Sequence, residues 1–283
     1  MERALAARLP DGRLHLQHGP IDLIISIEGP GTAMAEVAVV NRFEHVLEDL
    51  VEELPILRAP AGQEQGVTGI VAGRMMEAVH PFLPAFVTPM AAVAGSVADE
   101  MIATIRRCGG ITKAVVNNGG DVAVHLAPGA ETTAIIAGTN DRLTLTADQP
   151  WRGVATSGWR GRSWSLGIAD AVTVIARTAA TADAAATMIG NQVDLPGHPA
   201  ISRAPAESLA SESDLCGLHV TTDVAPLSRA DIDTALGRGA VYAGDLQARG
   251  VIGGAILLLQ GEARTVGASA PVLRCPEKEA VHG

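Results

Sequence analysis

The sequence predicts a single α+β unit in which helices pack on mixed, mostly antiparallel sheets. Two patterns support this class: apolar positions at helical spacing early in the chain, and a middle region of short strand patterns separated by turn dipeptides. The chain of 283 residues shows no internal repeat, low-complexity tract or long linker, which favours one unit over two domains. We expect residues 1–270 to form this unit and residues 271–283 to be a loose tail.

The first part of the chain predicts a hairpin that leads into a helix. Residues 13–27 alternate between apolar and polar types and are broken at Gly19-Pro20, which is the pattern of two short strands. Residues 32–54 carry apolar side chains at helical spacing. A loop rich in Pro, Gly and Gln follows at 57–67, and residues 68–80 predict the next helix.

A second helix is expected over residues 90–107, with Thr88 as its N-cap and Pro89 at its first position. Its first turns consist almost entirely of small residues, namely Ala91, Ala92, Ala94, Gly95, Ser96 and Ala98. Because these side chains have so little bulk, another backbone or a ligand can lie directly against this helix.

The middle of the chain predicts strands, and a helix follows them. Four strand patterns occupy residues 113–145, and residues 153–157 and 171–176 add two β-branched segments. Thr181 is expected to cap a helix that runs to about Gly190.

The remainder of the chain predicts a loop, a helix and a hairpin. Residues 196–209 are expected to form the loop. Residues 228–249 carry a helical pattern interrupted by glycines, and residues 251–267 predict a closing hairpin.

Composition excludes several classes of partner. The net charge is -10 and no run of Lys or Arg could neutralise a line of phosphates, so nucleic acid is not expected as a partner. No apolar stretch approaches the length of a membrane span, and no signal-like segment is seen. The three cysteines form no CxxC pair, which favours a reducing compartment. We therefore expect a cytoplasmic protein without a membrane partner; a homo-oligomer is left open.

The first candidate site is the turn formed by Asn117, Asn118, Gly119, Gly120 and Asp121. Two glycines directly after a strand allow positive φ and can expose successive N–H groups to a nucleotide or carboxylate. The same five residues also make a good hairpin turn, and the local pattern alone favours that structural role.

The second candidate site contains Thr156, Ser157, Gly158, Arg160 and Arg162. Hydroxyls and two guanidinium groups on a flexible turn suit the recognition of phosphate or carboxylate. A solvated hairpin tip with ordinary surface arginines is the alternative.

The third candidate is the pair Asp183 and Thr187. Their four-residue spacing places a carboxylate and a hydroxyl on one face of a helix, where both could ligate a hard cation such as Mg²⁺. An Asp near a helix start is, however, commonly a favourable partner of the helix dipole.

Four segments, taken in order, resemble the ApbE superfamily. They are TPMAAVAGSVAD at 88–99, VNNGGDV at 116–122, ATSGWRGRSWSLGIADAVTV at 155–174 and ADAAATMIGN at 182–191. The resemblance covers about residues 21–267 and is closer to the uncharacterised ApbE-like branch than to the flavin transferases themselves.

The resemblance implies a flavin-nucleotide pocket. It implies that Asp183 and Thr187 bind a Mg²⁺ ion that contacts the pyrophosphate of FAD, and that Ala91 or Ala92 offers a backbone carbonyl to the metal. It also implies that the small-residue helix with Gly95 approaches the flavin, whether FAD or FMN. The glycine turn at 117–121 would border the pocket and, with Arg160 or Arg162, would meet the phosphates.

Two departures from the flavin transferases concern the reaction. Ala94 stands where the transferases have a Lys, and residues 159–166 replace a His-containing segment. The leading hypothesis is therefore binding of a flavin nucleotide or another small anionic ligand. The resemblance links this branch to sulfur (homocysteine) or pterin-linked one-carbon metabolism. The alternatives are an FAD-dependent FMN transferase acting on a Thr or Ser of a partner protein, and a non-catalytic accessory or scaffold subunit.

Overall fold

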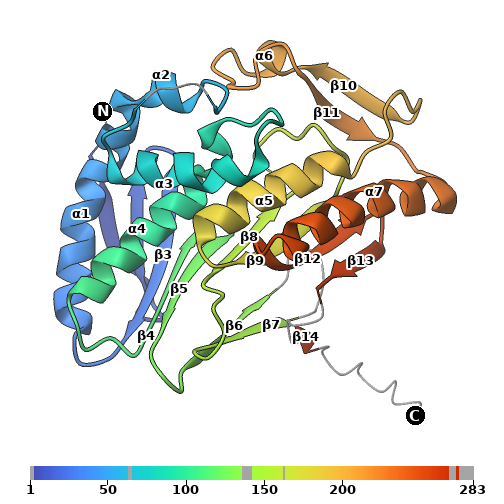
Figure 1. Cartoon of the computed structure of the whole chain (residues 1–283). Coiled ribbons are helices and arrows are strands. Elements are labelled where there is room, and N and C mark those ends of the chain that lie inside the picture. The colour runs from blue at the N-terminus through green and yellow to red at the C-terminus, as the bar shows by residue number, and fades with distance from the viewer. Residues whose placement is uncertain (1–2, 63–65, 136–141, 162, 268–271, 274–283) are drawn as a thin grey trace.

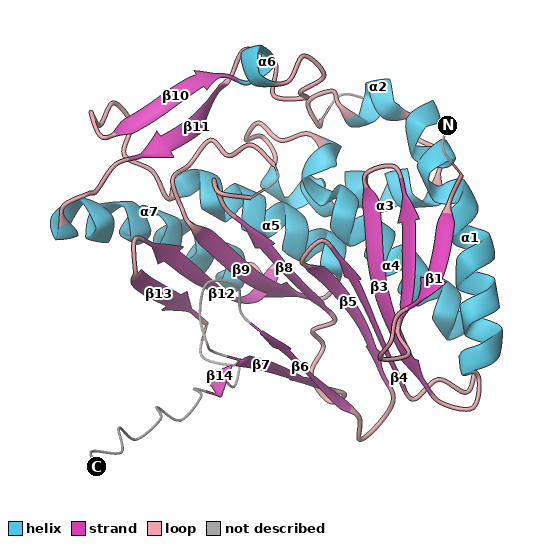
Figure 2. Ribbon diagram, turned by 180° about the vertical axis from the view of Figure 1, so that it is seen from behind, coloured by secondary structure: helices cyan, strands magenta, loops and turns pink. Residues whose placement is uncertain are grey.

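The computed structural model describes residues 3–62, 66–135, 142–161, 163–267 and 272–273. Its main element is a nine-stranded sheet in which all neighbouring strands pair antiparallel (Figures 1 and 2). In spatial order the strands are β1 (Leu5–Arg8), β2 (Leu14–His18), β3 (Ile21–Glu28), β4 (Lys113–Asn118), β5 (Asp121–Leu126), β8 (Gly153–Ser157), β9 (Ala171–Ala176), β12 (Ile252–Leu259) and β13 (Glu262–Val266).

Two small antiparallel sheets complete the strand content of the described residues. The first pairs β10 (Ile201–Pro205) with β11 (His219–Val224), and the second has the order β14 (Val272–Leu273), β7 (Arg142–Thr146), β6 (Glu131–Ile135). Of the tail expected at 271–283, only β14 belongs to the described residues, where it pairs with β7.

The long helices share one face of the large sheet, and the β6–β7–β14 sheet lies on the opposite face (Figures 1 and 2). The helices are α1 (Thr32–Glu52), α2 (Leu54–Leu57), α3 (Ile70–Val79), α4 (Val93–Arg107), α5 (Ala179–Gln192), α6 (Ala206–Leu209) and α7 (Arg229–Ala248), with 3-10 turns η1 (His80–Phe82) and η2 (Pro89–Ala92). No helix within the described ranges is long and apolar enough to cross a bilayer. The predicted α+β class with antiparallel sheets is confirmed.

Helix α5 lies at the centre of the helical layer. It packs against α4, α7, β8 and β9, and six of its alanines are buried. The predicted close approach to the small-residue helix is confirmed: a Cβ on Gly95 would lie 2.3 Å from the carbonyl oxygen of Ala179. Ala and Gly at this crossing let two backbones touch, which fixes the position of α5 relative to the start of α4.

Three local predictions need correction. Helix α5 is capped by Thr178, whose hydroxyl accepts the N–H of Thr181, so the helix begins earlier than predicted. Thr88 makes no side-chain cap, and the predicted helix at 90–107 begins as the 3-10 turn η2. The predicted loop at 196–209 contains β10 and α6. In that stretch, antiparallel pairing with β11, which follows later in the chain, decides the structure more than local sequence does.

Candidate functional site

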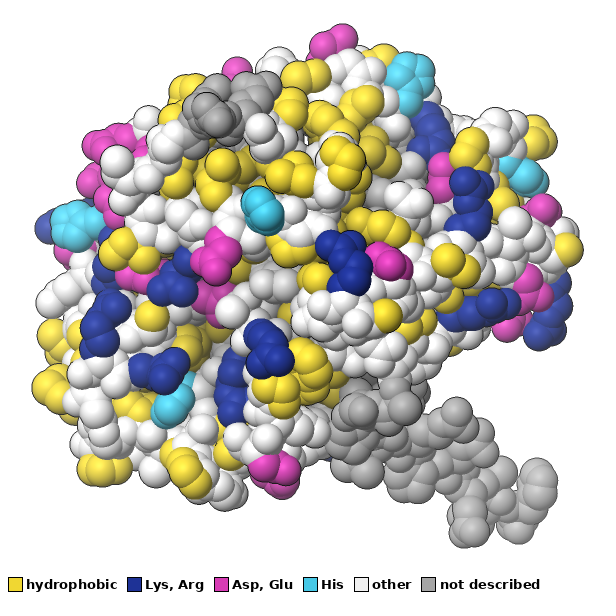
Figure 3. Space-filling model, in the orientation of Figure 1, with side chains coloured by type: hydrophobic (Ala, Val, Ile, Leu, Met, Phe, Trp, Pro, Cys, Tyr) yellow, Lys and Arg dark blue, Asp and Glu magenta, His cyan; other side chains and the backbone are white. Residues whose placement is uncertain are grey.

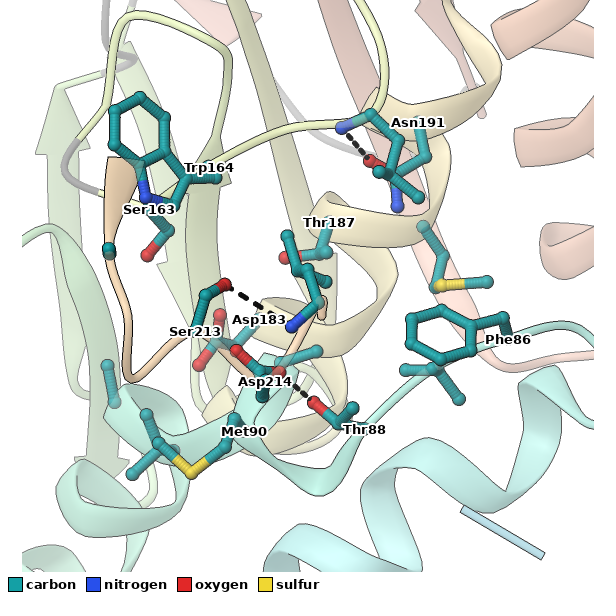
Figure 4. Close-up of a pocket in the computed structure, with 18 of the residues that line it drawn as sticks. Phe86, Thr88, Met90, Ser163, Trp164, Asp183, Thr187, Asn191, Ser213 and Asp214 are labelled. Carbon is teal, nitrogen blue, oxygen red and sulfur yellow. Dashed lines mark hydrogen bonds between the residues drawn. The ribbon is translucent and has the colours of Figure 1, made fainter. Parts of the chain in front are cut away.

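A pocket of about 340 Å³ opens where η2 and the start of α4 face α5 (Figure 4). Two connecting segments close its sides, residues 163–166 after β8 and residues 210–215 between α6 and β11. With Asp121 at the start of β5, the pocket therefore draws its walls from five separate parts of the chain. Its volume falls within the range of small-molecule sites, which is roughly 300–1,000 Å³.

One face of α5 supplies the polar floor of this pocket. Asp183, Thr187 and Asn191 all line it, at intervals of four residues along the helix. Asn191 is held in place because its Oδ1 accepts the backbone N–H of Leu166 at 3.0 Å. The first two residues were predicted from the sequence, whereas Asn191 was not, although it continues the same helical stripe.

Asp183 is fixed by a backbone donor from the neighbouring helix. Its Oδ2 accepts the N–H of Gly95 at 3.0 Å. Burial raises the pKa of Asp183 well above its usual range, and the nearby Asp121 carboxylate raises it further. A cation bound beside Asp183 would favour the ionised carboxylate, because its positive charge offsets both the cost of burial and the repulsion from Asp121.

The glycine turn reaches the pocket through one residue, Asp121. Its Oδ1 accepts the N–H of Thr156 at 3.3 Å, which ties the start of β5 to β8. Asn117 accepts the N–H of Gly120 at 2.8 Å, while Gly119 adopts a φ of 63°. Asn117, Gly119 and Gly120 thus form the hairpin turn between β4 and β5 and are not among the described residues that line the pocket.

Asn118 and the small-residue segment form the wall behind the pocket. Asn118 is buried and its Nδ2 donates to the carbonyl of Ala94 at 3.0 Å. Ala91 and Ala94 line the cavity, whereas Ala92 is buried and Gly95 packs against α5. Ala94, where the resemblance leads us to expect a Lys, therefore presents a methyl group to the pocket wall.

The second candidate cluster lies outside the lining. The hydroxyls of Thr156 and Thr173 are hydrogen-bonded to each other at 2.8 Å, and a Cβ on Gly158 would lie 2.3 Å from the carbonyl oxygen of Asp170.

The arginine of this cluster that the structure describes lies on the surface. Arg160 is 61% exposed, pairs with Asp170 at 3.0 Å and stacks on Trp159. Ser157 is also not among the lining residues, and Arg162 lies outside the described residues. Arg160 is thus an exposed side chain paired with Asp170, and its contact with a ligand phosphate stays a prediction.

Several lining residues were not found from the sequence. Phe86, Met90 and Trp164 contribute apolar and aromatic surface, and Trp164 is 40% exposed at the pocket. Thr88 donates a hydrogen bond from its hydroxyl to Asp214, which fastens the 210–215 segment to η2 (Figure 4). Met90 and Trp164 lie in segments that carry the family resemblance, but no local pattern assigns either side chain to a pocket, because only the tertiary fold brings them beside α5.

The charges of the lining residues have one sign. Four carboxylates line the pocket, from Asp121, Asp183, Glu212 and Asp214. The described part of the lining contains no Lys, Arg or His. An anion entering this pocket would meet repulsion unless a cation accompanies it.

The oxygen donors suit a hard divalent cation. The Asp183 carboxylate and the Thr187 hydroxyl lie one turn apart in the same cavity, and Mg²⁺ commonly uses one or two carboxylates with waters and substrate phosphates. Within the described ranges, no group of three or more His, Cys, Asp and Glu is arranged to hold a metal. The donor set therefore fits a metal shared with a ligand, rather than one enclosed by protein side chains.

Comparison with known proteins places the chain in a family. A family model described as "AbpE bacteria" matches residues 6–265, which is most of the chain. The chain belongs to the AbpE_bact family. All the pocket residues discussed above lie within the part that matches this AbpE_bact model.

Similar proteins include two archaeal UPF0280 proteins. The one from Archaeoglobus fulgidus is 34% identical over 140 residues, covering 48% of this chain and 58% of that protein. The one from Methanothrix thermoacetophila is 36% identical over 146 residues, covering 50% of this chain and 56% of that protein. The chain thus spans a little over half the length of these relatives.

Solved structures of flavin transferases are also similar. The apo form of the flavinyl transferase ApbE from Pseudomonas stutzeri has a TM-score of 0.46 at 13% identity, covering 95% of this chain and 97% of that chain. The flavin transferase ApbE from Vibrio cholerae has a TM-score of 0.46 at 11% identity, covering 94% of this chain and 97% of that chain. At these identities the chemistry of the AbpE_bact pocket has to be derived from its own residues.

Proposed function

We propose that this AbpE_bact protein binds a small anionic ligand, of the flavin-nucleotide type, through a divalent cation held by Asp183 and Thr187. The observation that carries the proposal is the acidic lining of the pocket. Four carboxylates and no described basic side chain surround a cavity that also has aromatic walls. A neutral ring system can enter such a cavity, but the phosphates attached to it need a positive partner that the described lining does not supply.

The role of each residue follows from its contacts. The Gly95 N–H holds the Asp183 carboxylate in one orientation, and α5 places the Thr187 hydroxyl one turn further along the same face. Asp121 adds negative potential to the cavity and so favours cation binding. When bound, the cation would neutralise phosphate charge and polarise a phosphoryl oxygen.

The apolar part of the pocket supports a planar ring as the other half of the ligand. Phe86, Met90, Trp164 and Met188 line the cavity together with the polar stripe of α5. Aromatic and thioether side chains bury flat ring systems well, whereas a few placed polar groups set the orientation. A ligand with a ring and a phosphate would use both parts of the pocket, as FMN and FAD do.

Transfer of FMN to a Thr or Ser of a partner protein receives less support. Ala94 in the pocket wall presents a methyl group where the transferases are expected to have an amine. Incubation with FAD, Mg²⁺ and a peptide carrying a flavinylation motif, followed by mass measurement, distinguishes the two functions. An unmodified peptide together with tight FAD binding would leave binding without transfer.

Titration of the purified protein with FAD, FMN and a pterin, each with excess Mg²⁺ or with EDTA, tests the ligand class. We expect a flavin nucleotide to bind only when Mg²⁺ is present. Binding of the pterin but of neither flavin would replace the flavin proposal with a different ring system. Absence of binding by all three ligands would favour the non-catalytic accessory role.

A further inference from the structure

Arginine side chains from three parts of the chain form a basic group beside the large sheet. Arg106 stands in the last turn of α4, Arg152 precedes β8, and Arg177 follows β9. Two backbone hydrogen bonds bring the strand segments together: Val124 N–H donates to the Arg152 carbonyl at 2.9 Å, and Arg152 N–H donates to the Ala176 carbonyl at 3.0 Å. In Figure 3, several Lys and Arg side chains gather on the lower part of the face shown.

The positive charges of this group are poorly neutralised. Arg106 and Arg177 are exposed, and within the described residues neither side chain makes a hydrogen bond or an ion pair. The Arg152 guanidinium donates to the carbonyls of Ala147 at 2.9 Å and Gln149 at 2.6 Å, which are neutral acceptors. Asp148 is the acid that faces Arg152, and it offsets one of three charges.

The pKa shifts agree with groups close enough to repel one another. The pKa of Arg152 is lowered by burial and then by the charge of Arg106. His125 on β5 lies beside them, and its pKa is lowered by burial and by the charges of Arg106 and Arg152. Three cations held together in this way, with Asp148 offsetting one of them, create a local positive potential on a protein whose net charge is -10.

The ring of Trp151 lies against this basic group. The Arg177 guanidinium lies 5.7 Å from the ring centroid of Trp151, in cation–π range. Half-buried Trp and exposed Arg are the residue types that dominate binding energy in protein interfaces. The planar Arg fork also matches a carboxylate in geometry.

We propose that the surface formed by Arg106, Arg152, Arg177 and Trp151 docks an acidic segment of a partner protein. A protein segment suits this surface better than nucleic acid does. A nucleic acid carries an unbroken line of charges and would extend past three arginines onto the rest of a strongly acidic molecule. A few Asp or Glu side chains on a folded partner can match this small patch without that cost. None of the four residues lines the acidic pocket, so the inference does not depend on the ligand bound there.

The test measures binding of a fluorescent polyglutamate peptide by anisotropy, with an oligonucleotide of equal charge as the comparison. We expect the wild-type protein to bind the peptide, more weakly as salt is raised, and the double variant Arg106→Glu/Arg177→Glu to lose about tenfold or more in affinity. Arg229→Glu is the matched control, because it changes the charge of an arginine that is 80% exposed at the start of α7, outside this group. Circular dichroism checks that each variant is folded.

Each outcome decides the proposal. A peptide affinity that falls in the double variant and stays within about twofold in Arg229→Glu supports it. Absence of peptide binding by the wild type would overturn it. So would a control variant that loses as much peptide affinity per reversed charge as the double variant does. Tighter binding of the oligonucleotide than of the peptide would also overturn it and assign the surface to nucleic acid.

Discussion

Asp183 Oδ2 accepts a hydrogen bond of 3.0 Å from the backbone N–H of Gly95, which joins the acid of α5 to the first turn of α4. The same glycine lets α5 approach, because a Cβ on Gly95 would lie 2.3 Å from the Ala179 carbonyl oxygen. One backbone position therefore sets both the packing of two helices and the orientation of the candidate metal ligand.

Gly95→Ala should destabilise the protein because the new methyl group overlaps the Ala179 backbone, which cannot rotate away. We expect a loss of about 1–3 kcal/mol in the free energy of unfolding, measured by urea denaturation. Gly73→Ala is the matched control, since Gly73 lies inside α3 and a methyl group added there would have no atom within 4 Å. It should gain about 0.5–1 kcal/mol. Equal effects of the two substitutions would contradict the close-packing account.

Asp183→Asn should stabilise the protein when no cation is present. The raised pKa of Asp183 means that folding at neutral pH must either bury a carboxylate charge or take up a proton, and both cost free energy. Asparagine keeps an acceptor for the Gly95 N–H without that cost, so we expect a gain of about 0.5–2 kcal/mol in the free energy of unfolding. Asp183→Ala should gain less, because it leaves the Gly95 donor without its partner. A variant Asp183→Asn that is less stable than wild type would be inconsistent with this explanation.

Asp99 should give the stability a measurable pH dependence. Its carboxylate accepts the N–H groups of Ala179 and Ala180, yet burial raises its pKa to about 6. A folded-state pKa above the unfolded value means that the native state binds more protons, so this contribution to stability is lost as pH rises through about 4 to 6. The free energy of unfolding of the wild type, minus that of Asp99→Asn, should therefore decrease by about 2 kcal/mol between about pH 4 and pH 7. If this difference did not change with pH across the range, burial would not be raising the pKa of Asp99.

Asp214→Ala should loosen the segment at 210–215. The Asp214 carboxylate accepts the hydroxyl of Thr88 and so connects that segment to η2. We expect faster hydrogen exchange in residues 210–218, corresponding to a loss of about 1.5–3 kcal/mol in local opening free energy. Glu212→Ala is the control from the same segment, because Glu212 is 79% exposed in its ion pair with Arg58 and such pairs contribute about 0–1 kcal/mol. If both substitutions had the same effect, the Thr88 contact would not be what holds the segment.

Local periodicity predicted most of the fold and one wall of the site. The alternation in β4 and β5 and the four-residue spacing of Asp183 and Thr187 are properties of short segments, and both are present in the structure. Trp164 and Asp214 could not be predicted, because loops far from α5 in sequence bring them to the pocket. The glycine turn forms the β4–β5 hairpin and reaches the cavity through Asp121, while ligand contact by its other residues stays a prediction.

The affinity for FMN in excess Mg²⁺ and in EDTA, compared between wild type and Asp183→Asn, tests the central claim most directly. We predict that EDTA weakens wild-type binding by about tenfold or more and that the variant binds weakly under both conditions. Thr187→Val provides a second ligand substitution at the same helical face and should lose part of the Mg²⁺ dependence. Tight FMN binding by wild type that is equal in Mg²⁺ and EDTA would contradict a cation at Asp183 and Thr187.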